Sequence, residues 1–163
     1  MSLKNLNVPN KTHKFLLNQL KDKQTFQIYK KFEKDLKLNE DFIVAVSGGP
    51  DSLALAFLSR IYSIKNKLKC KFYIVDHKIR PESSKEARKV KKILKQNSIE
   101  AEILTWKGKK PVKIKQSLAR KKRYELLFAK CHKHNIKNIL LGHHQDDLME
   151  NFFIRILRGS GLK

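Results

Sequence analysis

A glycine-rich turn between an apolar run and a helical segment is the feature that most restricts how this chain can fold. The run, residues 42–46 (FIVAV), is apolar throughout and rich in β-branched residues, which is typical of a strand buried on both faces of a parallel sheet. The turn SGGPDS at residues 47–52 opens a segment in which Leu55, Leu58 and Tyr62 share one helical face. A strand that passes directly into a helix in this way indicates an α/β fold.

The same turn has the properties of a phosphate-binding loop. Glycine lets the backbone turn tightly and approach a ligand, and the helix N-terminus adds unpaired N–H donors and the positive end of its dipole. Pro50 suits the first helical turn, where its missing N–H is not needed. Asp51 is placed to reach a magnesium ion carried by the phosphates. The residues predicted to bind the phosphates are Ser47, Gly48, Gly49, Pro50, Asp51 and Ser52.

This hexapeptide differs from the commonest nucleotide-binding loops. It is neither the GxGxxG dinucleotide fingerprint nor a Walker A loop, because no Gly-Lys-Ser/Thr follows. The alternative interpretation is an ordinary strand-to-helix turn in which Asp51 or a serine caps the helix. The complete motif, placed directly after a strand, favours the phosphate-binding interpretation.

Strand-like and helix-like segments alternate along the rest of the chain. Such alternation implies a parallel sheet with right-handed crossovers. The predicted fold is therefore α/β, a doubly wound parallel sheet with an N-terminal helix packed alongside. After ten residues expected to be disordered, the strands are predicted at residues 42–46, 71–75, 101–106 and 138–141, and the helices at residues 11–38, 51–65, 83–96, 113–134 and 147–158.

The charge balance favours a polyanionic partner. Lysine and arginine number 37 against 15 aspartates and glutamates, which gives a net charge of +22. A charge this large attracts nucleic acid through counterion release. The alternative is a solvated, lysine-rich surface, since only seven of the 37 cations are arginine.

Cysteine usage and hydropathy indicate a cytoplasmic protein. Cys70 and Cys131 are the only cysteines and form no CxxC pair, and the N-terminus has no apolar signal-peptide core. Two such thiols favour a reducing cytosol. No apolar run approaches the roughly 20 residues that span a bilayer, so no membrane partner is expected.

Five segments together resemble one enzyme family. SGGPDS resembles the PP-loop signature of the ATP pyrophosphatases, which cleave ATP to AMP and pyrophosphate while adenylating a substrate. The others are similar to motifs of the bacterial tRNA(Ile)-lysidine synthetases, and the resemblance runs from about residue 41 to residue 163. These segments are DHKIR at residues 76–80, ARKKRY at 119–124, GHHQDDLME at 142–150 and RILRGSGL at 155–162. Ile79 replaces the usual leucine of the DHKIR segment, and Asn151 replaces a threonine that commonly follows the GHHQDDLME segment.

The resemblance implies a catalytic site at the carboxyl edge of the sheet, where open α/β sheets bind ligands. It makes Arg120 and Arg123, three residues apart on one helix, a clamp on phosphate or adenylate. It also implies that His143 and Asp147 act where charge develops in the reaction. The alternatives are a solvated basic helix, structural histidines, and a capping box formed by Asp147 and Glu150.

The resemblance further implies the reaction. ATP, with Mg2+ near a catalytic Asp51, adenylates the C2 carbonyl oxygen of the wobble cytidine of tRNA(Ile), and free L-lysine then displaces AMP to give lysidine. On this basis residues 1–40 are expected to be a disordered segment and a helix. Residues 41–163 are expected to be a PP-loop ATP-binding catalytic domain, of the adenine nucleotide alpha hydrolase-like kind. Family members usually carry further C-terminal segments that help to bind the tRNA. The chain is therefore either a natural short form or a fragment truncated at its C-terminus, and the fragment is the expectation.

Two other functions are compatible with parts of the sequence. One is another tRNA-modifying enzyme of the same superfamily, such as a tRNA thiolase. The cytidine-thiolating branch typically carries CxxC pairs for an iron–sulfur cluster, and Cys70 and Cys131 cannot supply them. The other is a basic RNA-binding module without turnover, against which the intact SGGPDS and HHQDD segments argue.

Overall fold

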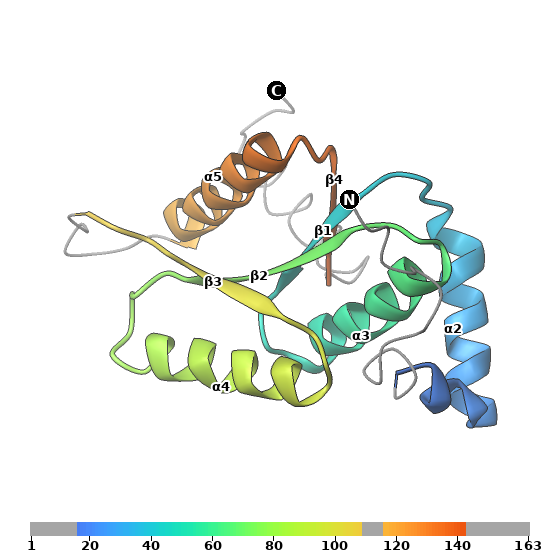
Figure 1. The fold of residues 1–163 in the computed structure, drawn as a ribbon. Helices are drawn as coiled ribbons and strands as arrows, with labels where there is room; N and C mark the ends of the chain where they lie inside the picture. The colour runs from blue at the N-terminus through green and yellow to red at the C-terminus, as the bar shows by residue number, and fades with distance from the viewer. Residues whose placement is uncertain (1–15, 109–115, 143–163) are drawn as a thin grey trace, which may run out of the picture.

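The computed structural model describes residues 16–108 and 116–142 of the chain. Within them, four parallel strands form one sheet in the order β3-β2-β1-β4 (Figure 1). The strands are β1 (Phe42–Val46), β2 (Cys70–Asp76), β3 (Ala101–Thr105) and β4 (Asn138–Leu141). The parallel sheet predicted from the sequence is confirmed.

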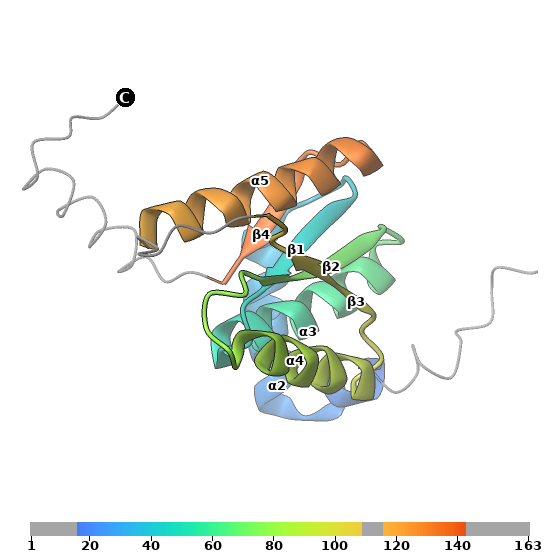
Figure 2. The same cartoon turned by 90° about the vertical axis from the view of Figure 1, so that its left-hand side faces the viewer.

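Helices cover both faces of this sheet. On one side lie α2 (Lys23–Leu36), α3 (Pro50–Lys65) and α4 (Ser83–Gln96), and on the other lies α5 (Gln116–His134) (Figure 2). The doubly wound arrangement expected from the sequence is therefore present. None of the helices in the described ranges is long and apolar enough to cross a lipid bilayer.

The side chains of β1 divide the core into two layers. Phe42, Val44 and Val46 pack in the layer beneath α2, α3 and α4, whereas Ile43 and Ala45 pack in the layer beneath α5. Successive side chains of a strand point to opposite faces, and all five are buried because both faces are covered. This is why β1 is apolar without interruption.

The order of the strands places one edge of the sheet at a topological switch point. The chain steps from β1 outward to β2 and β3, and then returns through α5 to β4 on the other side of β1. In open α/β sheets, ligands bind outside the carboxyl ends of the strands where the strand order reverses. Here that point lies beside the end of β1, which is followed directly by Ser47.

The N-terminal helix is interrupted, whereas the sequence predicted a continuous helix over residues 11–38. A 3-10 turn at Gln19–Lys21 ends at Asp22, and α2 begins afresh at Lys23. The Asp22 side chain accepts a hydrogen bond from the Thr25 amide at 2.8 Å. An aspartate that bonds the backbone in this way caps a new helix instead of continuing the old one.

The other predicted elements differ from the structure by small shifts at their ends. Helix α3 begins at Pro50, one residue early, and β2 extends one residue further at each end than predicted. The expectations for residues 1–10 and 147–158 lie outside the described residues.

Truncating Leu127 to alanine is expected to lower the free energy of unfolding by about 2–5 kcal/mol, because its side chain is fully buried between α5 and the sheet. The matched control is its neighbour Phe128, which is larger but 52% exposed. Phe128→Ala is expected to cost about 1 kcal/mol, mainly through lost stacking on Tyr124. Urea denaturation followed by circular dichroism measures both. Equal losses would contradict the placement of α5 against the sheet.

Candidate active site

The turn after β1 adopts a conformation that depends on Gly48. Its φ is +99°, in a region that residues with a side chain rarely adopt. A Cβ atom at this position would lie 2.5 Å from Cγ2 of Val90 on α4. Gly49 follows in an extended conformation as the N-cap of α3, and Pro50 occupies the first helical turn, as expected. The turn therefore lies against α4 with no space for a side chain.

Ser52 holds this turn together from inside. Its hydroxyl is buried, accepts hydrogen bonds from the Gly48 amide at 3.0 Å and the Ser47 hydroxyl at 3.1 Å, and donates to the Gly49 carbonyl at 2.9 Å. By contrast, Ser47 and Asp51 are exposed. The two serines that the sequence grouped together thus have different positions: Ser52 shapes the turn, and Ser47 lies where a ligand can reach it.

The end of β4 lies against the first turn of α3. A Cβ atom on Gly142 would lie 2.8 Å from Cα and 3.0 Å from the amide nitrogen of Ser52. Only glycine permits this approach. His143 and Asp147, which were predicted to be catalytic, lie outside the described residues, but Gly142 directly precedes His143 in the sequence.

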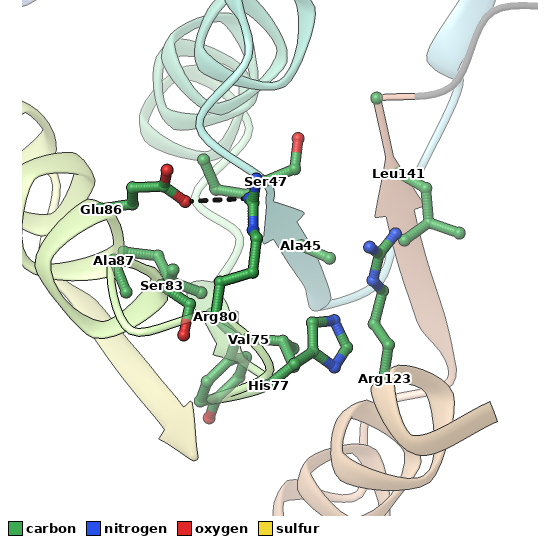
Figure 3. Close-up of a pocket in the computed structure, with 14 residues that line it drawn as sticks. Ala45, Ser47, Val75, His77, Arg80, Ser83, Glu86, Ala87, Arg123 and Leu141 are labelled. Carbon is green, nitrogen blue, oxygen red and sulfur yellow. Dashed lines mark hydrogen bonds and ion pairs between the residues drawn. The ribbon is translucent and has the colours of Figure 1, made fainter. Parts of the chain in front are cut away.

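A cavity of about 210 Å³ opens beside the turn, between the carboxyl ends of β1 and β2, the start of α4 and one side chain of α5. Arg80 and Arg123 extend into it from opposite sides, with the His77 ring between them (Figure 3). Among the described residues, two guanidinium groups and one carboxylate line the cavity, a net positive charge that favours an anion. The polar residues that line the cavity are Ser47, Tyr73, His77, Arg80, Ser83, Glu86 and Arg123.

Asp76 anchors the loop between β2 and α4, which forms one wall of the cavity. Its buried carboxylate accepts hydrogen bonds from the Ser83 hydroxyl, the Ser84 hydroxyl and the Lys78 amide at 2.6–2.9 Å. Burial by itself would raise the pKa of this carboxyl, but the hydrogen bonds outweigh burial and hold the pKa below its ordinary value. Asp76 is therefore an ionised support for the wall.

The two arginines predicted to form one clamp are separated in the structure. Arg123 lines the cavity, whereas Arg120 is not among the lining residues. The Arg120 guanidinium carbon lies 5.9 Å from the centroid of the Tyr124 ring, which stacks on Phe128. Asp51 is exposed in the first turn of α3 and does not line the cavity either.

No role was predicted from the sequence for His77, Arg80 or Glu86. His77 and Arg80 belong to the DHKIR segment that follows β2. The pairing of β2 with β1 is the signal that would have placed them at the site, because parallel neighbours end at the same edge. No comparable signal exists for Glu86, whose position depends on how α4 packs.

Comparison with known proteins shows the family of the chain. Residues 19–163 match a family model described as a PP-loop domain. The chain belongs to the PP-loop domain family. The match spans the SGGPDS turn, and the α/β fold predicted from the sequence is confirmed.

Several curated relatives carry one name. The chain is 43% identical over 131 residues to the tRNA(Ile)-lysidine synthase of Orientia tsutsugamushi (strain Boryong). The matched region covers 80% of this chain and 29% of the relative. It is 35% identical over 130 residues to the tRNA(Ile)-lysidine synthase of Bradyrhizobium diazoefficiens, and this match covers 78% of this chain and 36% of the relative. The chain thus spans only 29–36% of the length of these relatives.

A solved structure shares the fold. It is the U34-tRNA thiolase NcsA from Methanococcus maripaludis with its [4Fe-4S] cluster, with a TM-score of 0.67. The likeness covers 91% of this chain and 49% of the thiolase at 19% sequence identity. At this identity the likeness concerns the fold alone.

Replacing Gly48 with alanine is expected to lower the free energy of unfolding by about 2–4 kcal/mol, since alanine is strained at φ +99° and its Cβ would collide with Val90. Gly49→Ala is the matched control. Its φ is −71°, and the nearest atom to an added Cβ lies 4.0 Å away. The control is expected to cost about 1 kcal/mol or less, as a weaker N-cap. Urea denaturation measures both, and equal stability of the two variants would argue against the described turn.

Proposed function

We propose that this chain is the ATP-binding catalytic domain of a tRNA(Ile)-lysidine synthetase. The reaction joins L-lysine to C2 of the wobble cytidine of tRNA(Ile) and converts ATP to AMP and pyrophosphate. The observation that carries the proposal is the PP-loop at the start of α3, beside a cavity lined by Arg80 and Arg123. The surrounding chain is 43% identical to a curated synthase over 131 residues.

The turn and the cavity contain the groups needed to bind ATP. The first N–H groups of α3 have no acceptors within the helix, and together with the helix dipole they favour phosphate oxygens. Ser47 adds an exposed hydroxyl, and Arg123 adds a guanidinium whose planar donors match a phosphate. Ala45, Val75 and Leu141 form an apolar part of the lining that suits the adenine base.

Asp51 is the residue proposed to hold Mg2+. Its carboxylate is exposed in the first turn of α3, beside the N–H groups proposed to bind phosphate. Magnesium prefers carboxylate oxygens together with the phosphates of its substrate, so this position fits the ion. The chemistry that Mg2+ supplies when bound is neutralisation of charge on the pyrophosphate that leaves.

The proposed reaction consists of two displacements. The C2 carbonyl oxygen of the cytidine attacks the α-phosphorus of ATP, and pyrophosphate leaves. An amine of lysine then attacks C2 and loses a proton, and AMP leaves with the bonding electrons. Both steps build negative charge on phosphate oxygens, which the cations at the site stabilise. Arg123 is proposed for this role with Arg120 and His143, and Asp147 is proposed to organise these groups.

The net charge of +22 supports tRNA as the second substrate. Contacts between cationic side chains and phosphates position an RNA without reading its sequence. The proposed selection of tRNA(Ile) therefore requires base or shape recognition in addition to charge.

A tRNA thiolase is the second candidate, since a thiolase shares the fold. The two cysteines argue against it. Cys70 begins β2, at the edge of the sheet opposite the cavity, and burial raises the pKa of its thiol. Cys131 is buried on α5, and burial raises its pKa as well. Neither thiol is poised to react as a thiolate.

The proposed function is tested by incubating the protein with ATP, Mg2+, labelled lysine and tRNA(Ile), followed by nucleoside analysis of the tRNA. Because the chain spans only 29–36% of the length of the Orientia and Bradyrhizobium synthases, we expect weak lysidine formation at the wobble position, with one AMP formed per lysine attached. Asp51→Ala is expected to lower the rate by about a hundredfold or more. Because Asp51 is exposed, its replacement should change the unfolding free energy little.

Asp51→Asn is the matched control, because asparagine keeps the capping ability but loses the charge. Parental activity of both variants would contradict the magnesium role, and unfolding of the alanine variant alone would favour a capping role. Incorporation of labelled sulfur in place of lysine would identify a thiolase. RNA binding without pyrophosphate release from ATP would identify a non-catalytic module.

Replacing Cys70 and Cys131 together with serine is expected to leave lysidine formation within a few-fold of the parent. The physical reason is that both thiols stay protonated and lie away from the cavity. The same nucleoside analysis measures the outcome, with circular dichroism as the control for folding. Complete loss of activity in a folded double variant would favour the thiolase.

A further inference from the structure

Arg80 and Glu86 form an ion pair within the lining of the cavity. Nη2 of Arg80 lies 3.3 Å from Oε2 of Glu86, and the two side chains are 71% and 58% exposed. Both line the cavity together with Ser47 of the PP-loop. The Arg80 side chain extends from the loop after β2, on the side of the cavity away from Arg123 (Figure 3).

This ion pair is easily exchanged for another. An exposed ion pair contributes little to stability, because water solvates both partners and their side chains lose freedom on pairing. The backbone beneath Arg80 is firmly held in contrast, since Asp76 anchors the loop through its three hydrogen bonds. The backbone of Arg80 is therefore fixed, whereas its guanidinium can change partner with little loss of stability.

Glu86 occupies an unusual position for an anion-binding cavity. Among the described residues, it is the only carboxylate in the lining of this cavity. Other ion pairs in the described ranges, such as Lys130 with Glu102, have no member there. A carboxylate beside bound phosphates repels them, and its charge also competes for the nearest cation. The nearest cation with a resolved contact is Arg80.

We propose that Arg80 is an exchangeable phosphate contact. In the absence of nucleotide Glu86 holds its guanidinium, and on binding a phosphate of the nucleotide replaces Glu86. The inference rests on the proposed ATP site and adds a binding residue to it. A guanidinium pairs with phosphate through the same planar donors that it offers to a carboxylate, so the exchange needs only rotation of the side chain. Arg80 and Arg123 then hold the nucleotide from two sides.

The test is calorimetric titration of the whole chain with ATP and Mg2+. Arg80→Ala is expected to weaken ATP binding about tenfold, and Arg80→Lys to weaken it less, because lysine keeps the charge but lacks the planar fork. Glu86→Gln is expected to tighten binding a few-fold, since the competitor for Arg80 is removed. In the Arg80→Ala background, Glu86→Gln should add only a small change, because its main effect passes through Arg80.

Matched controls separate this contact from general charge and from folding. Arg88→Ala and Glu82→Gln make the same charge changes at exposed positions outside the lining, and each should leave ATP affinity close to that of the parent. Adenosine is the ligand control, because it lacks phosphate. The Arg80 variants are expected to bind adenosine as the parent does.

Two outcomes would overturn the role of Arg80 alone, and a third would refute the ATP site itself. ATP affinity of Arg80→Ala equal to that of Arg88→Ala would overturn the inference while leaving the ATP site in place. An equal loss for adenosine would also overturn it, since Arg80 would then support only the shape of the cavity. If the parent protein bound no ATP, the proposed function itself would be refuted, and the inference with it.

Discussion

The whole site depends on two approaches that only glycine allows. Gly48 brings the SGGPDS turn against Val90 of α4, and Gly142 brings the end of β4 against Ser52 of α3. A side chain at either position would move the turn or the strand away. These approaches let the Ser52 hydroxyl close the turn from inside, so that the first N–H groups of α3 point toward the open edge of the sheet. The turn is thus shaped before any ligand arrives.

The order of the strands decides which residues surround that turn. β2 pairs with β1 on one side and ends in the loop that carries Arg80, while β4 pairs on the other side and ends at Gly142. Helix α5 returns across the opposite face and brings Arg123 to the same edge. Arg80 and Arg123, 43 positions apart, therefore meet at one cavity, because β1, β2 and β4 end there and α5 crosses beside them.

Much of the fold was predictable because burial leaves a direct trace in the sequence. A strand covered on both faces has to be apolar throughout, and β1 shows this pattern. The break at Asp22 was missed because the helical spacing of apolar residues lies beyond it, at Tyr29, Phe32 and Leu36. One side chain that bonds the Thr25 amide decides the boundary. Arg120 and Arg123 differ by about 60° around the helix axis. Sequence spacing cannot tell which of them faces the cavity, since that depends on how α5 rotates against the sheet.

In a chain this basic, the net charge attracts anions, and charged side chains at the cavity discriminate between them. The net charge of +22 attracts ATP and RNA alike, and its influence fades beyond about 8–10 Å in physiological salt. Discrimination between polyanions therefore has to arise at contact distance. In the cavity, an anion has to displace the Glu86 carboxylate before it can bind Arg80. An anion that pairs weakly with a guanidinium gains little by this replacement. A polyphosphate, which offers several charged oxygens to two guanidiniums at once, gains more. The Glu86 carboxylate thus makes a cavity that attracts anions in general select for polyphosphates.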